Sequence, residues 1–110
     1  MAGTKSVQLQ TLTCHRTNDG PRDEAYLLYN GQEVFGPVSI NDGQSRDIGV
    51  TKPIEGQARV SLFDEDDTSS DDAMGTITIS ANEKGQRFQT LTGSGARYTL
   101  FYQIVTVTPQ

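Results

Sequence analysis

The sequence contains few of the residues that build covalent or metal-linked frameworks. It has one cysteine, Cys14, one histidine, His15, and no tryptophan. A single cysteine excludes an internal disulfide, and one cysteine with one histidine cannot supply the ligands of a Cys/His zinc site. Because neighbouring side chains of a strand point to opposite faces, we expect a buried Cys14 and a surface His15 rather than a catalytic dyad.

Positive charge and long apolar segments are also scarce. Nine Lys and Arg residues stand against 14 Asp and Glu residues, for a net charge of -5, and the basic residues form no run. We therefore expect no nucleic-acid binding. No apolar run approaches the ~20 residues of a membrane helix, so the chain is not expected to be transmembrane. Residues 1–5 lack the apolar stretch of a signal peptide, which favours a cytoplasmic location by default, or an excised module of a secreted protein.

What recurs along the chain is the alternation of apolar and polar residues that is typical of strands. The clearest runs are 7–11, 58–63, 76–80 and 98–105, and shorter ones lie at 25–29, 33–35, 46–50 and 87–91. Turn signals separate them, among them Asn30-Gly31 and Gly93-Ser94-Gly95. The pattern predicts an all-β fold: an antiparallel two-sheet β-sandwich of seven or eight strands over residues 6–110, after a flexible tail at residues 1–5. The four tyrosines lie in these runs and are expected in the core: Tyr26, Tyr29, Tyr98 and Tyr102.

Six carboxylates gather in one nine-residue window between two of these runs: Asp64, Glu65, Asp66, Asp67, Asp71 and Asp72. Like charges this close raise one another's pKa and destabilise the fold when all are ionised. Calcium, which takes six to eight oxygen ligands, would remove that repulsion. Asp64 and Asp66 lie two apart and point to one side of a strand end, and a loop that doubles back brings Asp72 to them. A second acidic loop, residues 17–24, contributes Asp19 and Asp23. The alternatives are a solvated acidic loop and an ordinary Asx turn at Asp19-Gly20.

The acidic window resembles the calcium-binding loop of the C2 domain family. In that family Asp-X-Asp is followed by five residues, a further Asp, two residues and Gly, and here Asp64-Glu65-Asp66 is followed by five residues and Asp72-Ala73-Met74-Gly75. Asp23, directly before an apolar strand, is similar to the second aspartate of an earlier family loop, and Asp19 would take the first place with a spacing two residues shorter. An EF-hand fits worse, because Ser69 and Gly75 stand where that loop needs Gly and Glu.

This resemblance implies two four-stranded sheets over residues 6–107, with calcium bound between loops at one end. The implied ligands are Asp19, Asp23, Asp64, Asp66 and Asp72, with Asp71 in reserve. Lipid-binding members usually carry basic or large apolar residues at the loop tips. The tip in this sequence, residues 67–70, reads Asp-Thr-Ser-Ser and has neither.

The functional expectation is a non-enzymatic module that binds one or two Ca²⁺ ions and mediates calcium-dependent stability or binding of an unknown protein or lipid partner. Assembly into a homo-oligomer is a further alternative that the sequence leaves open. The alternative is a metal-free structural or adhesive β-sandwich. A small hydrolase ranks far below: Asp67-Thr68-Ser69 resembles the triplet of dimeric aspartic proteases, but Glu65 and Asp66 precede it where those enzymes need an apolar strand.

Overall fold

The computed structural model describes residues 3–18 and 20–108. Over this range the chain forms eight strands and no helix, so the described residues contain no helical segment able to cross a membrane. The strands are β1 (Thr4–Arg16), β2 (Asp23–Tyr29), β3 (Gln32–Ile40), β4 (Ser45–Pro53), β5 (Gln57–Asp64), β6 (Asp72–Ser80), β7 (Arg87–Gly93) and β8 (Ala96–Val107).

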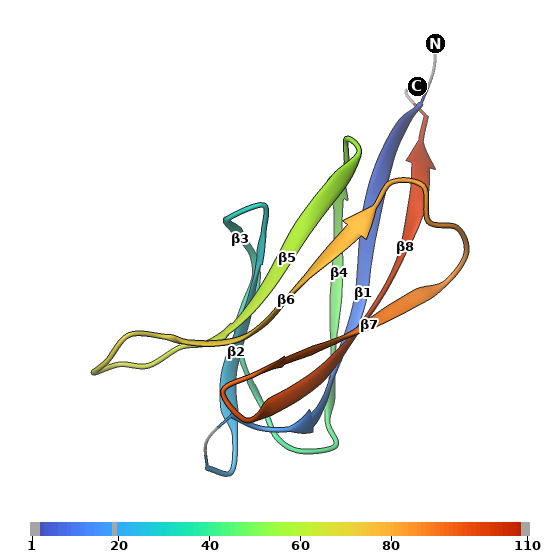
Figure 1. Ribbon diagram of the computed structural model, residues 1–110. Helices are drawn as coiled ribbons and strands as arrows, with labels where there is room; N and C mark the ends of the chain where they lie inside the picture. The colour runs from blue at the N-terminus through green and yellow to red at the C-terminus, as the bar shows by residue number, and fades with distance from the viewer. Residues whose placement is uncertain (1–2, 19, 109–110) are drawn as a thin grey trace.

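The strands form two four-stranded antiparallel sheets that pack face to face (Figure 1). The first sheet has the order β4-β1-β8-β7 and the second the order β3-β2-β5-β6. The predicted all-β sandwich is therefore confirmed, and each of the eight strand runs found in the sequence lies inside one observed strand.

The core between the sheets follows the predicted alternation on β5, whereas a bulge interrupts it on β1. On β5, Ala58, Val60 and Leu62 are buried, and the residues between them face outward. On β1, Val7, Leu9 and Thr11 alternate with Gln8 and Gln10, which predicts Thr11 on the inner face with Val7 and Leu9. A bulge between Leu9 and Thr11 instead turns Leu12 inward. The expected inward position of Thr11 was wrong, because a bulge inserts one residue and shifts the pattern that follows it.

A close approach of β6 to β7 joins the two sheets along one side. Gly75 of β6 has a φ of +134°, and a Cβ there would lie 2.7 Å from the backbone nitrogen of Thr92 and 2.9 Å from the Cβ of Leu91. Only glycine tolerates both this conformation and this contact. The glycine that ends the acidic motif thus has a packing role between the sheets.

Tight turns close the hairpins where the sequence predicts them. Asn30 and Gly31 join β2 to β3 with φ values of 51° and 86°, as a two-residue hairpin turn of left-handed backbone requires. Ser94 and Gly95 join β7 to β8 with φ values of 50° and 85°. These turns fix the register of the strands that carry the functional side chains.

The antiparallel order gathers the connections β1–β2, β3–β4, β5–β6 and β7–β8 at one end of the sandwich, which we call the loop end. The start of β1 and the end of β8 lie together at the opposite end (Figure 1). β1 begins at Thr4, inside the segment where the sequence predicts a tail, because Thr4 and Lys5 pair with Val107 and Thr106.

Candidate metal centre

Three aspartates of the β5–β6 connection converge at the loop end. Asp64 is the last residue of β5 and Asp72 the first of β6, and the two are directly opposite each other in the antiparallel register. Asp66 follows Asp64 by two residues. One carboxylate oxygen from each of Asp64, Asp66 and Asp72 lies within 4.8 Å of the others. We call these three residues the aspartate triad.

The geometry and donor type of the triad fit a calcium ion. Calcium binds oxygen at ~2.3–2.6 Å, so two oxygens on the same ion lie at most roughly 5 Å apart. The 4.8 Å span of the triad oxygens is within that limit. All three donors are carboxylates, the ligand type that hard divalent cations prefer. The triad supplies three ligands, and a calcium ion would complete its shell with backbone carbonyls, further carboxylates or water.

Asp64 is the most buried member of the triad, with 7% of its surface exposed. Burial raises the pKa of its carboxyl to about 6, and the charges of Asp23, Asp66 and Asp72 add to the rise. A hydrogen bond of 2.8 Å from the Glu24 backbone N–H to Oδ1 acts in the opposite direction. The carboxylate is therefore held in a position where its negative charge is unfavourable without a cation.

Asp66 also has a raised pKa, although its side chain is more exposed than that of Asp64. Partial burial raises its pKa first, and the neighbouring charges of Asp72 and Asp71 raise it further. Repulsion between like charges is what a bound cation relieves. For both Asp64 and Asp66, burial is the largest cause of the raised pKa, and the crowding of carboxylates around a common point adds to it.

Asp23 lies close enough to act on the charge of Asp64 but is not part of the triad. It is fully buried. Both its oxygens accept the backbone N–H of Asn18 at 3.0 Å, and Oδ2 also accepts the Tyr98 hydroxyl at 2.5 Å. An ionised carboxylate has about four acceptor sites, so one lone pair of Oδ1 is left for a further partner. These bonds tie the β1–β2 connection to β8.

Asp71 braces the acidic loop from the outside. Its Oδ1 accepts the Asp66 backbone N–H at 3.0 Å, and its Oδ2 accepts the Tyr26 hydroxyl at 2.5 Å. These two bonds hold the pKa of Asp71 below its usual value. The structure therefore places Asp71 outside the triad, with each of its oxygens accepting one hydrogen bond. Asp19, the remaining predicted ligand, lies outside the described residues.

Tyr26 is a site residue that the sequence reasoning missed. It was expected in the core, but it lies half-buried on the outer face of β2, where its ring stacks on Phe63 at 5.6 Å between centroids. Burial and the bond to Asp71 raise its pKa to about 12, so its hydroxyl stays protonated and donates to Asp71. The signal was present, since Ala25, Leu27 and Tyr29 alternate inward and leave Tyr26 outward.

Hydrogen bonds join the other connections of the loop end to one another. The Thr17 backbone N–H donates to Oδ1 of Asp42 at 2.8 Å, which links the β1–β2 and β3–β4 connections. Asn18 Nδ2 donates to the Ser94 carbonyl at 2.7 Å, and the Ser94 hydroxyl donates to the Ala73 carbonyl at 3.0 Å. Among the described residues, Oδ1 of Asn18 is a buried acceptor without a partner. The triad therefore sits in a connected framework rather than on an isolated loop.

Cys14 and His15 were weighed as a catalytic dyad, and Asp67-Thr68-Ser69 as a protease triplet. Cys14 is buried in the core, and its burial raises the pKa of the thiol. His15 is exposed, and its Nε2 lies 2.7 Å from the Thr99 hydroxyl. The two side chains are on opposite sides of β1, as their neighbouring positions predict. Asp67, Thr68 and Ser69 are exposed on the loop tip.

Comparison with known proteins identifies the architecture. No family model and no curated protein sequence match this chain. Among solved structures, a C2 domain aligns with a TM-score of 0.58 at 13% identity, covering 93% of this chain and 97% of that one. The fold is C2-like. The C2A domain of a plant extended synaptotagmin 1 aligns with a TM-score of 0.53 at 10% identity, with 98% of both chains covered.

A third C2-like match is part of a larger protein. The human GIVD cytosolic phospholipase A2 aligns with a TM-score of 0.59 at 15% identity. The alignment covers 98% of this chain but 17% of the phospholipase. At these identities the C2-like likeness concerns the fold, so the chemistry of the loop end has to be argued from its own residues.

Proposed function

We propose that this protein is a calcium-binding module whose loop end holds the ion between the carboxylates of Asp64, Asp66 and Asp72. The observation that carries the proposal is the convergence of three carboxylate oxygens within 4.8 Å of one another. In the C2-like fold these residues lie at the end of β5, in the following connection and at the start of β6. The register of two core strands, rather than a mobile loop, therefore sets the position of Asp64 and Asp72.

Electrostatics supports a cation rather than a bare acidic surface. The triad carries up to three negative charges, and its most buried member has a pKa raised to about 6. A divalent ion replaces carboxylate–carboxylate repulsion with attraction and so stabilises the folded state. Asp23 is proposed as a fourth ligand through its remaining lone pair. Asp71 and Asp19 complete the proposed set, with Asp71 also shaping the loop through Asp66 and Tyr26.

The proposed role of the ion is to stiffen the loop end and lower its negative potential so that a partner can dock there. The loop tip, residues 67–70, is exposed and carries neither basic nor large apolar side chains. This composition favours a protein partner over insertion into a bilayer. One structure of the similar human phospholipase was solved in complex with terbium chloride.

The experiment that tests the proposal is thermal unfolding in excess EGTA, in calcium and in matched magnesium, with titration calorimetry to obtain the calcium affinity. At a calcium concentration ~100 times Kd, binding adds about 2.7 kcal/mol of stability. That corresponds to a rise in Tm of about 10 °C for a domain of this size. Asp66→Asn should weaken calcium binding at least tenfold, or about 1.4 kcal/mol.

Asp67→Asn is the matched control, because it removes the same charge from the same loop at an exposed position outside the triad. It should leave calcium affinity within about twofold of the original protein. Equal losses in Asp66→Asn and Asp67→Asn would mean that calcium senses only the overall charge of the loop. A Tm that calcium does not raise above magnesium would favour the metal-free structural sandwich instead.

A further inference from the structure

Two arginines face each other on the outer side of the first sheet, close to the loop end. Arg16 at the end of β1 pairs with Arg97 at the start of β8. A bulge between Cys14 and Arg16 leaves His15 as the extra residue, so that His15 and Arg16 both turn outward and are exposed. With Arg97 and Thr92 they line a groove of about 460 Å³, which we call the Arg16–Arg97 groove.

This arrangement is electrostatically unfavourable without a ligand. Like charges directly opposite each other on neighbouring strands destabilise a sheet. The chain has 14 carboxylates for nine Lys and Arg residues, yet among the described residues neither Arg16 nor Arg97 lies within 4.0 Å of a carboxylate. Elsewhere, Arg22 and Arg87 do have carboxylate partners, at 3.7 Å and 3.3 Å. Both arginines line the groove, and there no carboxylate of the described residues compensates their charges.

We infer that the Arg16–Arg97 groove binds a phosphate monoester carried by a soluble molecule. A guanidinium group offers a planar fork of N–H donors that matches two phosphate oxygens, and a dianion between two such groups compensates both charges. His15 adds an imidazole beside the groove, oriented by its hydrogen bond of 2.7 Å with the Thr99 hydroxyl. The Thr92 hydroxyl is a further polar group of the lining.

The net charge of the protein favours a soluble phosphate monoester over a membrane lipid as the ligand. The chain has a net charge of -5, and the aspartate triad lies at the same end of the sandwich as the groove. An extended anionic membrane would face this whole negative surface, which weakens its binding. A single phosphate monoester enters the groove alone and meets mainly the two arginines. The inference therefore commits to a soluble ligand, and membrane binding is an outcome that the test separates.

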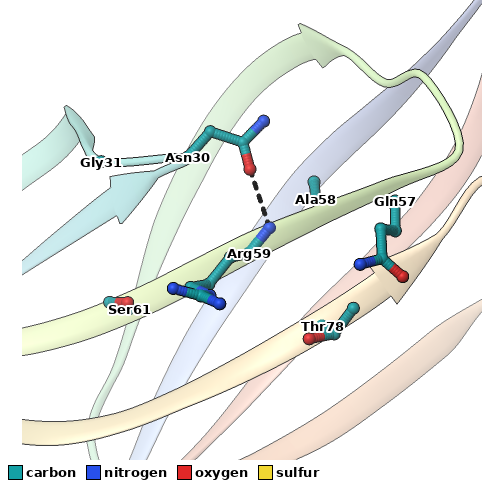
Figure 2. Close-up of a pocket in the computed structure, with 7 residues that line it drawn as sticks. All are labelled: Asn30, Gly31, Gln57, Ala58, Arg59, Ser61 and Thr78. Atoms are coloured by element: carbon teal, nitrogen blue, oxygen red, sulfur yellow. Dashed lines mark hydrogen bonds between the residues drawn. The ribbon is translucent and has the colours of Figure 1, made fainter.

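A second groove on the other sheet provides the internal comparison. It has a volume of about 520 Å³ and is lined by Asn30, Gln57, Arg59, Ser61 and Thr78, with Gly31 and Ala58 (Figure 2). Figure 2 shows Arg59 on β5 as the one basic side chain among these residues. This second groove is slightly larger than the Arg16–Arg97 groove but lacks an opposed pair of arginines. Arg59→Gln therefore removes one exposed positive charge from a comparable polar groove.

The test is titration calorimetry with O-phosphoserine at constant ionic strength, using the full chain. The original protein should bind saturably at a single site. Arg16→Gln and Arg97→Gln should each weaken binding at least tenfold, whereas Arg59→Gln should change it less than about twofold. Asp66→Asn should leave phosphoserine binding unchanged, which separates this inference from the calcium proposal.

Thermal unfolding of the same variants checks that they fold. Because Arg16 and Arg97 are exposed and repel each other, either substitution should leave Tm unchanged or raise it slightly. The inference is overturned if the original protein shows no saturable binding, or if Arg59→Gln weakens it as much as Arg16→Gln. It is also overturned if phosphatidylcholine vesicles containing phosphatidic acid bind through these arginines while O-phosphoserine does not, which would identify a membrane ligand.

Discussion

The buried hydrogen bond between Tyr98 and Asp23 offers the sharpest test of how the loop end is held together. The hydroxyl donates to Oδ2 at 2.5 Å, and both side chains are fully buried. Burial and the bond to Asp23 raise the pKa of Tyr98 far above its usual value, so the hydroxyl stays a donor. A hydrogen bond to a charged group contributes about 1.5–3 kcal/mol. Tyr98→Phe should therefore lower the free energy of unfolding by about 2–3 kcal/mol, a fall in Tm of about 10 °C.

Tyr29→Phe is the matched control for this prediction. Tyr29 is also buried, but its hydroxyl donates to a neutral acceptor, the Pro53 carbonyl, at 2.7 Å. The same chemical change should lower the free energy of unfolding by only about 1 kcal/mol. Urea unfolding in EGTA measures both losses, provided that the m-values agree. If Tyr98→Phe destabilises the protein no more than Tyr29→Phe, Asp23 does not carry a buried charge and the account of this bond is wrong.

Three further predictions concern the triad and its surroundings. The pKa of Asp64 is about 6 in the folded protein and 3.8 ordinarily, so the folded state keeps a proton that the unfolded state releases. In EGTA, the free energy of unfolding should fall as pH rises from about 4 to about 6. Urea titrations of Asp64→Asn should lack this fall. Parallel pH profiles of Asp64→Asn and the original protein would contradict the prediction. Gly75→Ala should destabilise the protein by more than about 2 kcal/mol in thermal unfolding, and Gly85→Ala, which has open space around it, by only about 1 kcal/mol. Tyr26→Phe should weaken calcium binding about threefold by calorimetry, because it removes the hydrogen bond from the Tyr26 hydroxyl to Asp71. An unchanged affinity would exclude a role of Tyr26 in calcium binding.

The sequence predicted the fold well because strand formation depends on local patterns. Alternation and turn residues are read from neighbouring positions, and they located all eight strands and the Asn30-Gly31 hairpin. The bulge at Gln10 was not predictable in this way. It depends on how β1 pairs with β4 and β8 at once, and those strands are distant in the sequence. Thr11 was consequently assigned to the wrong face.

The candidate site was predictable where its residues belong to one segment. The spacing of Asp64, Asp66 and Asp72 anticipated that they converge, because a hairpin brings the two ends of its own loop together. The partners of Asp23 and Asp71 were not predictable. Tyr98 and Tyr26 reach these carboxylates from strands far along the chain, 75 and 45 residues away, and such pairings follow only from the packed arrangement.

The pairing of the two terminal strands determines how the domain responds to a pulling force. β1 and β8 are antiparallel neighbours, paired from Thr4 and Val107 at one end to Arg16 and Arg97 at the other. Tension applied at the start of β1 and the end of β8 opens this ladder one hydrogen bond at a time, like a zipper, instead of shearing many bonds together. The loop end is reached last, and β5 and β6 lie in the other sheet. Under load, the aspartate triad should therefore keep its shape after the terminal pairing has begun to separate.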